Sequence, residues 1–182
     1  MGICFRIKRV DVIFIRAYGK TMQVLFKNSF GVQIPLKEVV KDVVQYLRND
    51  VNSTYKIIIG TDSLYLPSKN ADFVTVVVVY RVGNGGRYFW RGFEKGKFYT
   101  LRDRIIQEVL FSIDAAKEVL EELKKNSDLP HWDFEIHADI GDVGPTKALI
   151  QEVVGMIRAN NFEVKTKPDS YAASKVADRH VR

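Results

Sequence analysis

The sequence predicts an α/β protein in which helices lie on the faces of a mixed five-stranded sheet. From residue 56 onward, the apolar patterns follow the order strand, strand, strand, helix, strand, helix, strand, helix. A Gly-Asn-Gly-Gly stretch at 83–86 predicts a hairpin, so the first strands should pair antiparallel. The later strands are joined through helices, and such crossovers predict parallel pairing.

The strands are expected where β-branched and aromatic residues gather between turn signals. Residues 73–82 are almost all β-branched, which is typical of a strand that is buried on both faces. The returning strand interleaves aromatic with basic side chains, and Pro168 breaks the last strand. The expected strands are residues 56–66, 73–82, 87–98, 133–140 and 162–166.

The helices are expected where apolar residues recur three and four positions apart. Pro35 stands at the start of the first such segment, which suits the first position of a helix. Thr100 and Thr146 can cap the next two. The expected helices are residues 36–49, 101–125, 147–160 and a last one from about 170 to the C-terminus.

The 182 residues suffice for one domain with a sizeable core and a small appendage. We assign residues 54–182 to this domain and residues 1–53 to an N-terminal extension. Within the extension, residues 5–15 mix apolar and basic side chains, which indicates either an extra strand or an ill-ordered leader.

The composition narrows the classes of function. No segment reaches the roughly eighteen uninterrupted apolar residues of a membrane helix. The single cysteine, Cys4, excludes an internal disulfide and a cysteine-based metal cage, which favours a reducing cytoplasm. The net charge of +6 favours a polyanionic partner such as nucleic acid.

Asp62 is the first candidate functional residue. It lies in the stretch IIIGTDSLYL, where three isoleucines lead into it and apolar residues continue after it. An unpaired buried carboxylate is costly, so such a residue is normally paired, hydrogen-bonded or bound to a metal. The alternative is that Asp62 ends the strand and bonds the following turn.

The long helix at 101–125 directs one acid toward the sheet. On a helical wheel, Glu108 falls on the margin of the buried stripe, beside Leu101 and Val119. Asp103 and Asp114 fall on the opposite side and should face solvent. Glu108 is therefore either a site residue or a partly exposed boundary glutamate.

Two further acids lie at ends or margins of later elements. Asp139 closes the apolar strand Ile-His-Ala-Asp, a common ligand position in α/β sheets, and Asp142 follows it in a loop. Asp178 flanks the apolar face of the last helix. His180 on that face is either a ligand or base, or simply packed.

Carboxylates that crowd together repel one another unless a cation lies among them. Oxygen ligands favour Mg²⁺ or Mn²⁺, and two such ions about 4 Å apart can support phosphodiester cleavage. The auxiliary candidates near the four acids are Ser63, His180, Asp142 and Lys147. The candidates for contact with nucleic-acid phosphates are Arg87, Arg91, Lys165, Lys167, Lys175 and Arg179.

The motifs IIIGTDS, HADIGDVGPTK and KPDSYAASKVADRH resemble a family of uncharacterised bacterial ribonuclease H-like proteins. The wider superfamily runs βββαβαβα, with acids on the first strand, first helix, fourth strand and last helix. The resemblance covers about residues 56–182 and implies a metal-dependent nuclease. Its implied metal ligands are Asp62, Glu108, Asp139 and Asp178.

The chain departs from ribonuclease H in two places. Its first strand reads Thr-Asp-Ser rather than Asp-Gly-Ser, and residues 126–132 carry no basic protrusion. The substrate is therefore open among RNA, an RNA/DNA hybrid and structured DNA.

Two other readings compete with a nuclease. The first is a non-catalytic nucleic-acid-binding or assembly module, in which the aromatic and basic strand at 87–99 stacks on bases, unless those rings only pack the sheet. The second, an actin-like ATPase, lacks support, because GDVGPTK does not end in the Gly-Lys-Ser/Thr of a phosphate loop.

Overall fold

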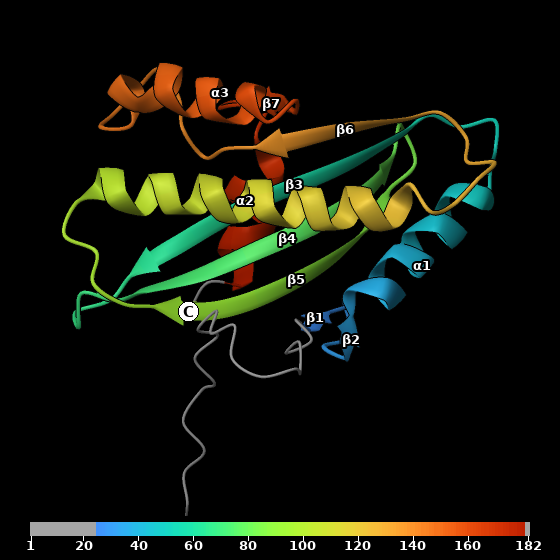
Figure 1. The fold of residues 1–182 in the computed structure, drawn as a ribbon, viewed down its shortest axis with the longest axis horizontal. Coiled ribbons are helices and arrows are strands. Elements are labelled where there is room, and N and C mark those ends of the chain that lie inside the picture. The colour runs from blue at the N-terminus through green and yellow to red at the C-terminus, as the bar shows by residue number, and fades with distance from the viewer. Residues whose placement is uncertain (1–24, 181–182) are drawn as a thin grey trace, which may run out of the picture.

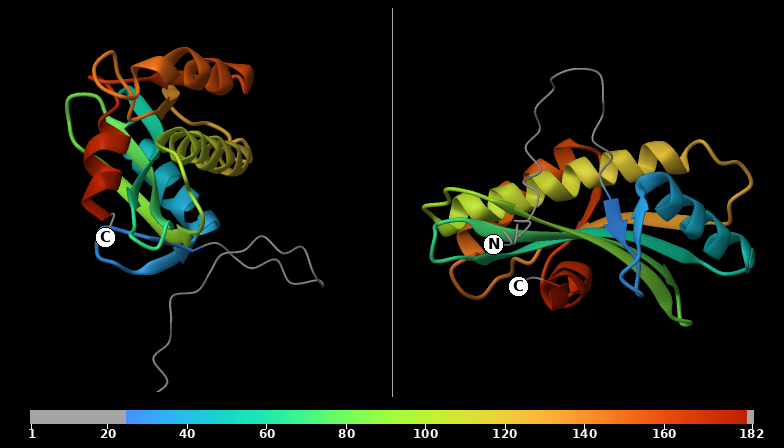
Figure 2. Two further views of the ribbon diagram at one scale, coloured as in Figure 1. Left: turned by 90° about the vertical axis from the view of Figure 1, so that its left-hand side faces the viewer. Right: turned by 90° about the horizontal axis from the view of Figure 1, so that it is seen from below.

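The computed structural model describes residues 25–180, apart from the side chains of residues 173 and 174. Helices α1 (Leu36–Arg48), α2 (Leu101–Leu123) and α3 (Ile150–Ala159) pack on one face of a sheet. A short C-terminal helical segment, drawn in red, lies against the other face (Figure 2). The fold therefore has three layers, with the sheet in the middle.

The sheet confirms the predicted mixture of antiparallel and parallel pairs. Its strand order is β2-β1-β5-β4-β3-β6-β7 (Figure 1). The meander β3-β4-β5 is antiparallel, whereas β6 pairs parallel with β3 and β7 pairs parallel with β6. The strands are β1 (Leu25–Lys27), β2 (Gln33–Pro35), β3 (Tyr55–Tyr65), β4 (Ala71–Arg81), β5 (Gly86–Lys95), β6 (Trp132–His137) and β7 (Glu163–Lys165).

The expected number of five strands is wrong, because residues 25–180 form seven. The two additional strands, β1 and β2, make a hairpin that joins the edge of β5 where Lys27 pairs with Trp90. Each has only three residues, which is too short for a period-two pattern to stand out in the sequence. The strand considered at 5–15 lies outside the described residues.

The helices follow the expected order, but the start of α3 and the C-terminal helix differ from the expectation. The Thr100 hydroxyl accepts a hydrogen bond from the Asp103 N–H at 3.0 Å, which confirms the predicted cap of α2. Thr146 caps no helix, because its hydroxyl accepts from the Gly141 N–H at 3.4 Å within the preceding loop. A 3₁₀ turn, η1 (Lys147–Leu149), therefore precedes α3.

The last helix is not a regular α-helix. A π-helical segment, η2 (Ala172–Ala177), is followed by a 3₁₀ turn, η3 (Asp178–His180). Ala172 and Ala177 pack against Ile58 of β3, which joins this segment to the sheet. Among residues 25–180, none of the helices combines the length and apolar character that crossing a membrane requires.

Side chains of β3 alternate between the two faces of the sheet. Ile57 and Ile59 belong to the main core beneath α1, α2 and α3, whereas Ile58 belongs to the core beneath η2. Asp62 shares the parity of Ile58 and so belongs to the η2 face, while its neighbour Ser63 belongs to the α2 face. The acid and the serine therefore reach opposite layers from adjacent positions.

β3 extends beyond its partner β6. The last pair between them joins Gly60 to His137, so residues 61–65 continue with β4 on one side only. This free edge is next to the point where the chain leaves β6 and reaches residues 138–140. A side chain that follows β6 therefore lies beside the part of β3 where this free edge begins.

Val77 in β4 is fully buried in the main core, and its truncation tests the packing of the sheet. Val77→Ala should lower the free energy of unfolding by about 2 kcal/mol, from lost apolar burial and the cavity left behind. The matched change Val51→Ala, at an exposed position, should stay within about 0.5 kcal/mol. Urea titration measures both; equal losses would contradict the assigned core.

Candidate metal centre

Asp62 lies at the free edge of β3, largely shielded from solvent. Its Oδ1 accepts a hydrogen bond from the Ser63 N–H at 2.8 Å. Burial, together with the negative charges of Asp139 and Asp178, raises the pKa of Asp62 to about 6. The Ser63 N–H and the Arg104 guanidinium oppose that rise without cancelling it. β3 thus holds the Asp62 carboxylate close enough to Asp139 and Asp178 for their charges to affect it.

Glu108 approaches the same edge from α2. Its side chain is buried, although the helical wheel placed it on the margin of the apolar stripe. The Ser63 hydroxyl donates a hydrogen bond to its Oε1 at 2.5 Å. Burial, and then the charges of Asp62 and Asp139, raise the pKa of Glu108 to about 8. Ser63 therefore connects the strand to the buried glutamate of the helix.

Asp139 is the second residue after β6, where the free edge of β3 begins. Its Oδ2 lies 3.0 Å from the Nζ of Lys167, which forms an ion pair with it. Its Oδ1 is buried and accepts no hydrogen bond from a protein group. An unpartnered buried carboxylate oxygen is costly, so this atom fits a site that receives a cation or a water molecule.

Asp178 opens η3 and is exposed. It follows η2, the segment that packs against Ile58 of β3, and its charge adds to the rise in the pKa of Asp62. The structure therefore brings Asp62, Asp139 and Asp178 into one electrostatic neighbourhood, and Glu108 joins it from the α2 face.

The four acids form an open arrangement rather than a closed cage. Within residues 25–180, no three His, Cys, Asp or Glu side chains gather closely enough to hold one ion. The donor chemistry still fits Mg²⁺ or Mn²⁺, because all four side chains offer oxygen. The vacant hydrogen-bonding capacity of the Asp139 Oδ1 agrees with that fit.

Arg104 is a residue of this site that the sequence analysis missed. Its Nη1 donates to the Ser63 carbonyl oxygen at 2.5 Å and to the Ser63 Oγ at 3.1 Å. It lies four positions before Glu108 on α2, and its charge lowers the pKa of both Asp62 and Glu108. The i, i+4 spacing of an arginine and a glutamate was the signal that could have identified it.

A hydroxyl network continues inward from Glu108. The Ser112 Oγ donates to the Thr61 Oγ1 at 2.9 Å, and the Thr61 Oγ1 is hydrogen-bonded to the Thr75 Oγ1 at 2.9 Å. All three residues are buried. These hydroxyls lie on three different elements, and no local sequence pattern indicates that they meet beside the acids.

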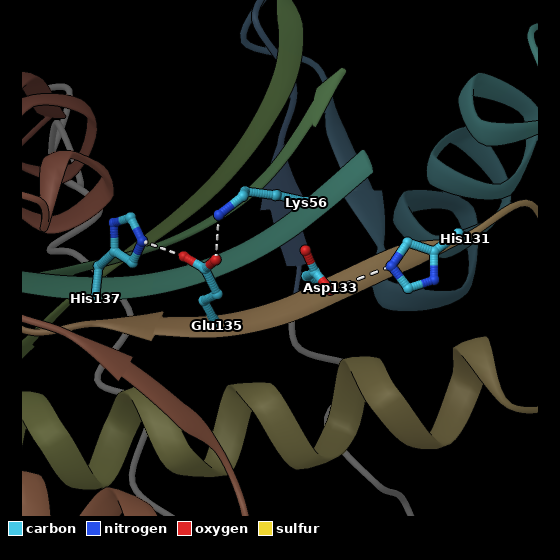
Figure 3. Close-up of polar contacts among 5 residues, drawn as sticks. All are labelled: Lys56, His131, Asp133, Glu135 and His137. Carbon is cyan, nitrogen blue, oxygen red and sulfur yellow. Dashed lines mark hydrogen bonds and ion pairs between the residues drawn. The ribbon is translucent and has the colours of Figure 1, made fainter. Parts of the chain in front are cut away.

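A second polar cluster holds the η2 face together (Figure 3). The Lys56 Nζ donates to the Glu135 Oε1 at 2.5 Å, and the His137 Nε2 lies 3.2 Å from the Glu135 Oε2. The Ala172 N–H donates to the His137 Nδ1 at 3.3 Å, so Nε2 carries the proton and donates to Glu135. His137 therefore attaches β6 to η2, the segment that leads to Asp178.

Burial lowers the pKa of His137, which keeps its ring neutral as this arrangement requires. Burial alone would raise the pKa of Glu135, but the hydrogen bonds from Lys56 and His137 lower it. The cluster is therefore a charged lysine–glutamate pair with a neutral histidine.

The auxiliary candidates fall in different places. Ser63 contacts Glu108, whereas His180 stacks on Trp90 of β5 with ring centroids 4.4 Å apart. Asp142 and Lys147 are exposed in the segment between β6 and α3. Ser63 is thus the auxiliary residue in direct contact with a site acid, and His180 packs against the sheet.

The basic candidates are also dispersed. Lys167 contacts Asp139, while Arg91 pairs with Glu118 at 3.1 Å. Arg87 lies over the Tyr46 ring at 5.1 Å. The remaining candidates are the partly buried Lys165 and the exposed Lys175 and Arg179.

Glu108 predicts how stability depends on pH in a metal-free solution. Its pKa rises from an ordinary 4.5 to about 8 on folding, so the folded state binds the proton more tightly. This contribution to stability is fully present below about pH 4.5 and is lost as pH rises through about 8. Urea unfolding with EDTA should show the wild type losing more stability than Glu108→Gln between about pH 5 and about pH 8.

The control for this measurement is Glu121→Gln, which removes an exposed acid from the same helix. That variant should follow the wild type across the pH range. If Glu108→Gln also follows the wild type, the glutamate is not held in its protonated form by the fold.

Comparison with known proteins agrees with this architecture. The family model described as Ribonuclease H-like matches residues 38–182. The "Uncharacterized protein YkuK" of Bacillus subtilis (strain 168) is 32% identical over 168 residues, covering 87% of this chain and 97% of that protein. A solved structure, the foamy viral protease-reverse transcriptase in complex with dsDNA, matches 72% of this chain and 92% of its own at 12% identity, with a TM-score of 0.32. The extent of the family match shows that the chain belongs to the ribonuclease H-like family.

Proposed function

We propose that this chain is a divalent-metal-dependent nuclease that hydrolyses phosphodiester bonds in RNA, an RNA/DNA hybrid or structured DNA. The observation that carries the proposal is the convergence of Asp62, Glu108 and Asp139 at the free edge of β3, where the Asp139 Oδ1 is buried without a hydrogen-bond partner. A fold that crowds carboxylates at one strand end, against their repulsion, is arranged to receive a cation.

The metal ligands in this proposal are Asp62, Glu108, Asp139 and Asp178. Bound Mg²⁺ or Mn²⁺, in one or two positions, would lower the pKa of a water molecule and stabilise the leaving oxygen. Binding of a cation would also shift the acids to their ionised form. The rise in pKa therefore predicts competition between protons and metal at Asp62 and Glu108.

The other side chains of the site act on the acids or on the substrate. Ser63 and Arg104 fix the orientation of Glu108 through the hydrogen bonds described above. Lys167 is half exposed, so it can exchange its contact with Asp139 for a phosphate oxygen of a bound strand. The net charge of +6 supports a polyanionic substrate.

One observation favours a second candidate, a non-catalytic nucleic-acid-binding module. The Lys167 ammonium already neutralises Asp139 at 3.0 Å, which a scaffold without metal would also need. Base stacking by the aromatic strand β5 gives this module less support, because one face of Trp90 is stacked on His180 and does not face a base. The nuclease is therefore the function that the site favours.

Two single substitutions test the nuclease directly. Asp62→Asn and Asp139→Asn keep size and hydrogen bonding but remove a charge, so each should reduce Mn²⁺-dependent cleavage by at least about 100-fold. The assay is a panel of labelled single-stranded RNA, RNA/DNA hybrid and branched DNA, each with Mn²⁺ and with EDTA.

The matched control is Asp114→Asn, which removes an exposed acid from α2 and should leave cleavage unchanged. Full activity in both Asp62→Asn and Asp139→Asn would reject the proposal. Salt-sensitive binding of the same panel, without cleavage by the wild type under any condition, would favour the binding module.

A further inference from the structure

A cavity of about 250 Å³ lies between the end of β3 and the start of α2, and the site described above does not account for it. Its lining consists of two aromatic rings, an apolar side chain, a hydroxyl and a guanidinium. These residues are Tyr65, Tyr99, Thr100, Leu101 and Arg104. The cavity is therefore aromatic and cationic.

The two tyrosines are exposed to an extent that core packing does not explain. Tyr65 is 47% exposed and Tyr99 is 70% exposed. The Tyr65 hydroxyl donates to the Phe98 carbonyl oxygen at 3.3 Å, which anchors its ring at the wall of the cavity. The Lys69 Nζ lies 5.3 Å from the centroid of the Tyr99 ring. Two rings are thus held at the surface next to positive charge.

The cavity and the carboxylate site share a wall. Arg104 lines the cavity and also donates to Ser63, whose hydroxyl donates to Glu108. Its charge acts on Asp62 and Glu108. A molecule in the cavity therefore lies one side chain away from the acids.

We propose that this cavity binds one unpaired nucleobase, and that the substrates of the chain carry unpaired nucleotides next to the bond that is cut. The second half of this statement rests on the proposed nuclease function. Exposed aromatic rings next to cations form the usual surface for the bases of single strands. A paired base inside a duplex cannot offer its face to a ring, because its neighbours cover it.

The size and charge of the cavity favour this occupant over others. A volume of about 250 Å³ suits a single ring system. Arg104 and Lys69 complement the phosphates that accompany a base, and a purely apolar ligand carries no such charge.

The test compares binding of fluorescein-labelled oligothymidylate with binding of a labelled blunt duplex of equal length. Fluorescence anisotropy measures both, and the buffer contains EDTA so that nothing is cleaved. Tyr65→Leu and Tyr99→Leu should each weaken binding of the single strand by about fivefold or more, because each removes a stacking face. Binding of the duplex should not change with either variant.

Two variants serve as matched controls. Tyr65→Phe keeps the stacking ring and loses the hydrogen bond to Phe98, so it should bind the single strand more tightly than Tyr65→Leu does. Phe30→Leu removes a ring that is 89% exposed on the β1–β2 hairpin, and it should leave binding unchanged. Thermal unfolding of all four variants establishes that each is folded.

The proposal is overturned if both leucine variants bind the single strand as the wild type does, or if the wild type binds the duplex more tightly than the single strand. It is also overturned if the wild type binds neither. If binding depends on the tyrosine rings but no metal-dependent cleavage occurs, nucleobase binding in the cavity stands and the nuclease proposal is rejected. If cleavage occurs but binding does not depend on the rings, the nuclease proposal stands and nucleobase binding in the cavity is rejected.

Discussion

The confinement of carboxylates at the free edge of β3 is the constraint on which the rest of the site depends. Asp62 lies in the part of β3 that extends beyond its last pair with β6. Asp139 lies beside it because it is the second residue after β6. Burial, and then the charge of Asp139, raises the pKa of Asp62 well above its ordinary value. A fold tolerates the cost of buried carboxylates where function requires it, so this edge of β3 is a candidate functional site.

Two hydrogen-bonded supports hold this edge from opposite layers. On the α2 face, Arg104 and Ser63 position Glu108. On the η2 face, the neutral ring of His137 accepts from the Ala172 N–H and so fixes the start of the segment that ends at Asp178. Because the supports lie on different helices, the acids meet only when both layers are docked on the sheet. The sheet edge, rather than a loop, therefore sets the geometry of the site.

The sequence predicted the parts of the molecule that depend on local pattern. The order of strands and helices followed from apolar periodicity, and Asp62 was conspicuous because it interrupts an apolar strand. Three-residue strands carry too little pattern, so the β1–β2 hairpin was missed. Lys167 was proposed for phosphate contact, but its ion pair with Asp139 depends on two loops meeting in space. The cavity lined by Tyr65 and Tyr99 could not be predicted from local pattern either, because the two rings become neighbours only when β3 and the start of α2 come together.

A crystal soaked in Mn²⁺ would show whether these acids surround a cation. Anomalous scattering locates manganese without reference to activity, substrate or variant. We expect an anomalous peak in contact with oxygens of Asp62 and Asp139, with Glu108 in the same coordination group and the Lys167 ammonium displaced from Asp139. A fully soaked crystal with no anomalous peak at the end of β3, and with Lys167 still paired to Asp139, would contradict this expectation.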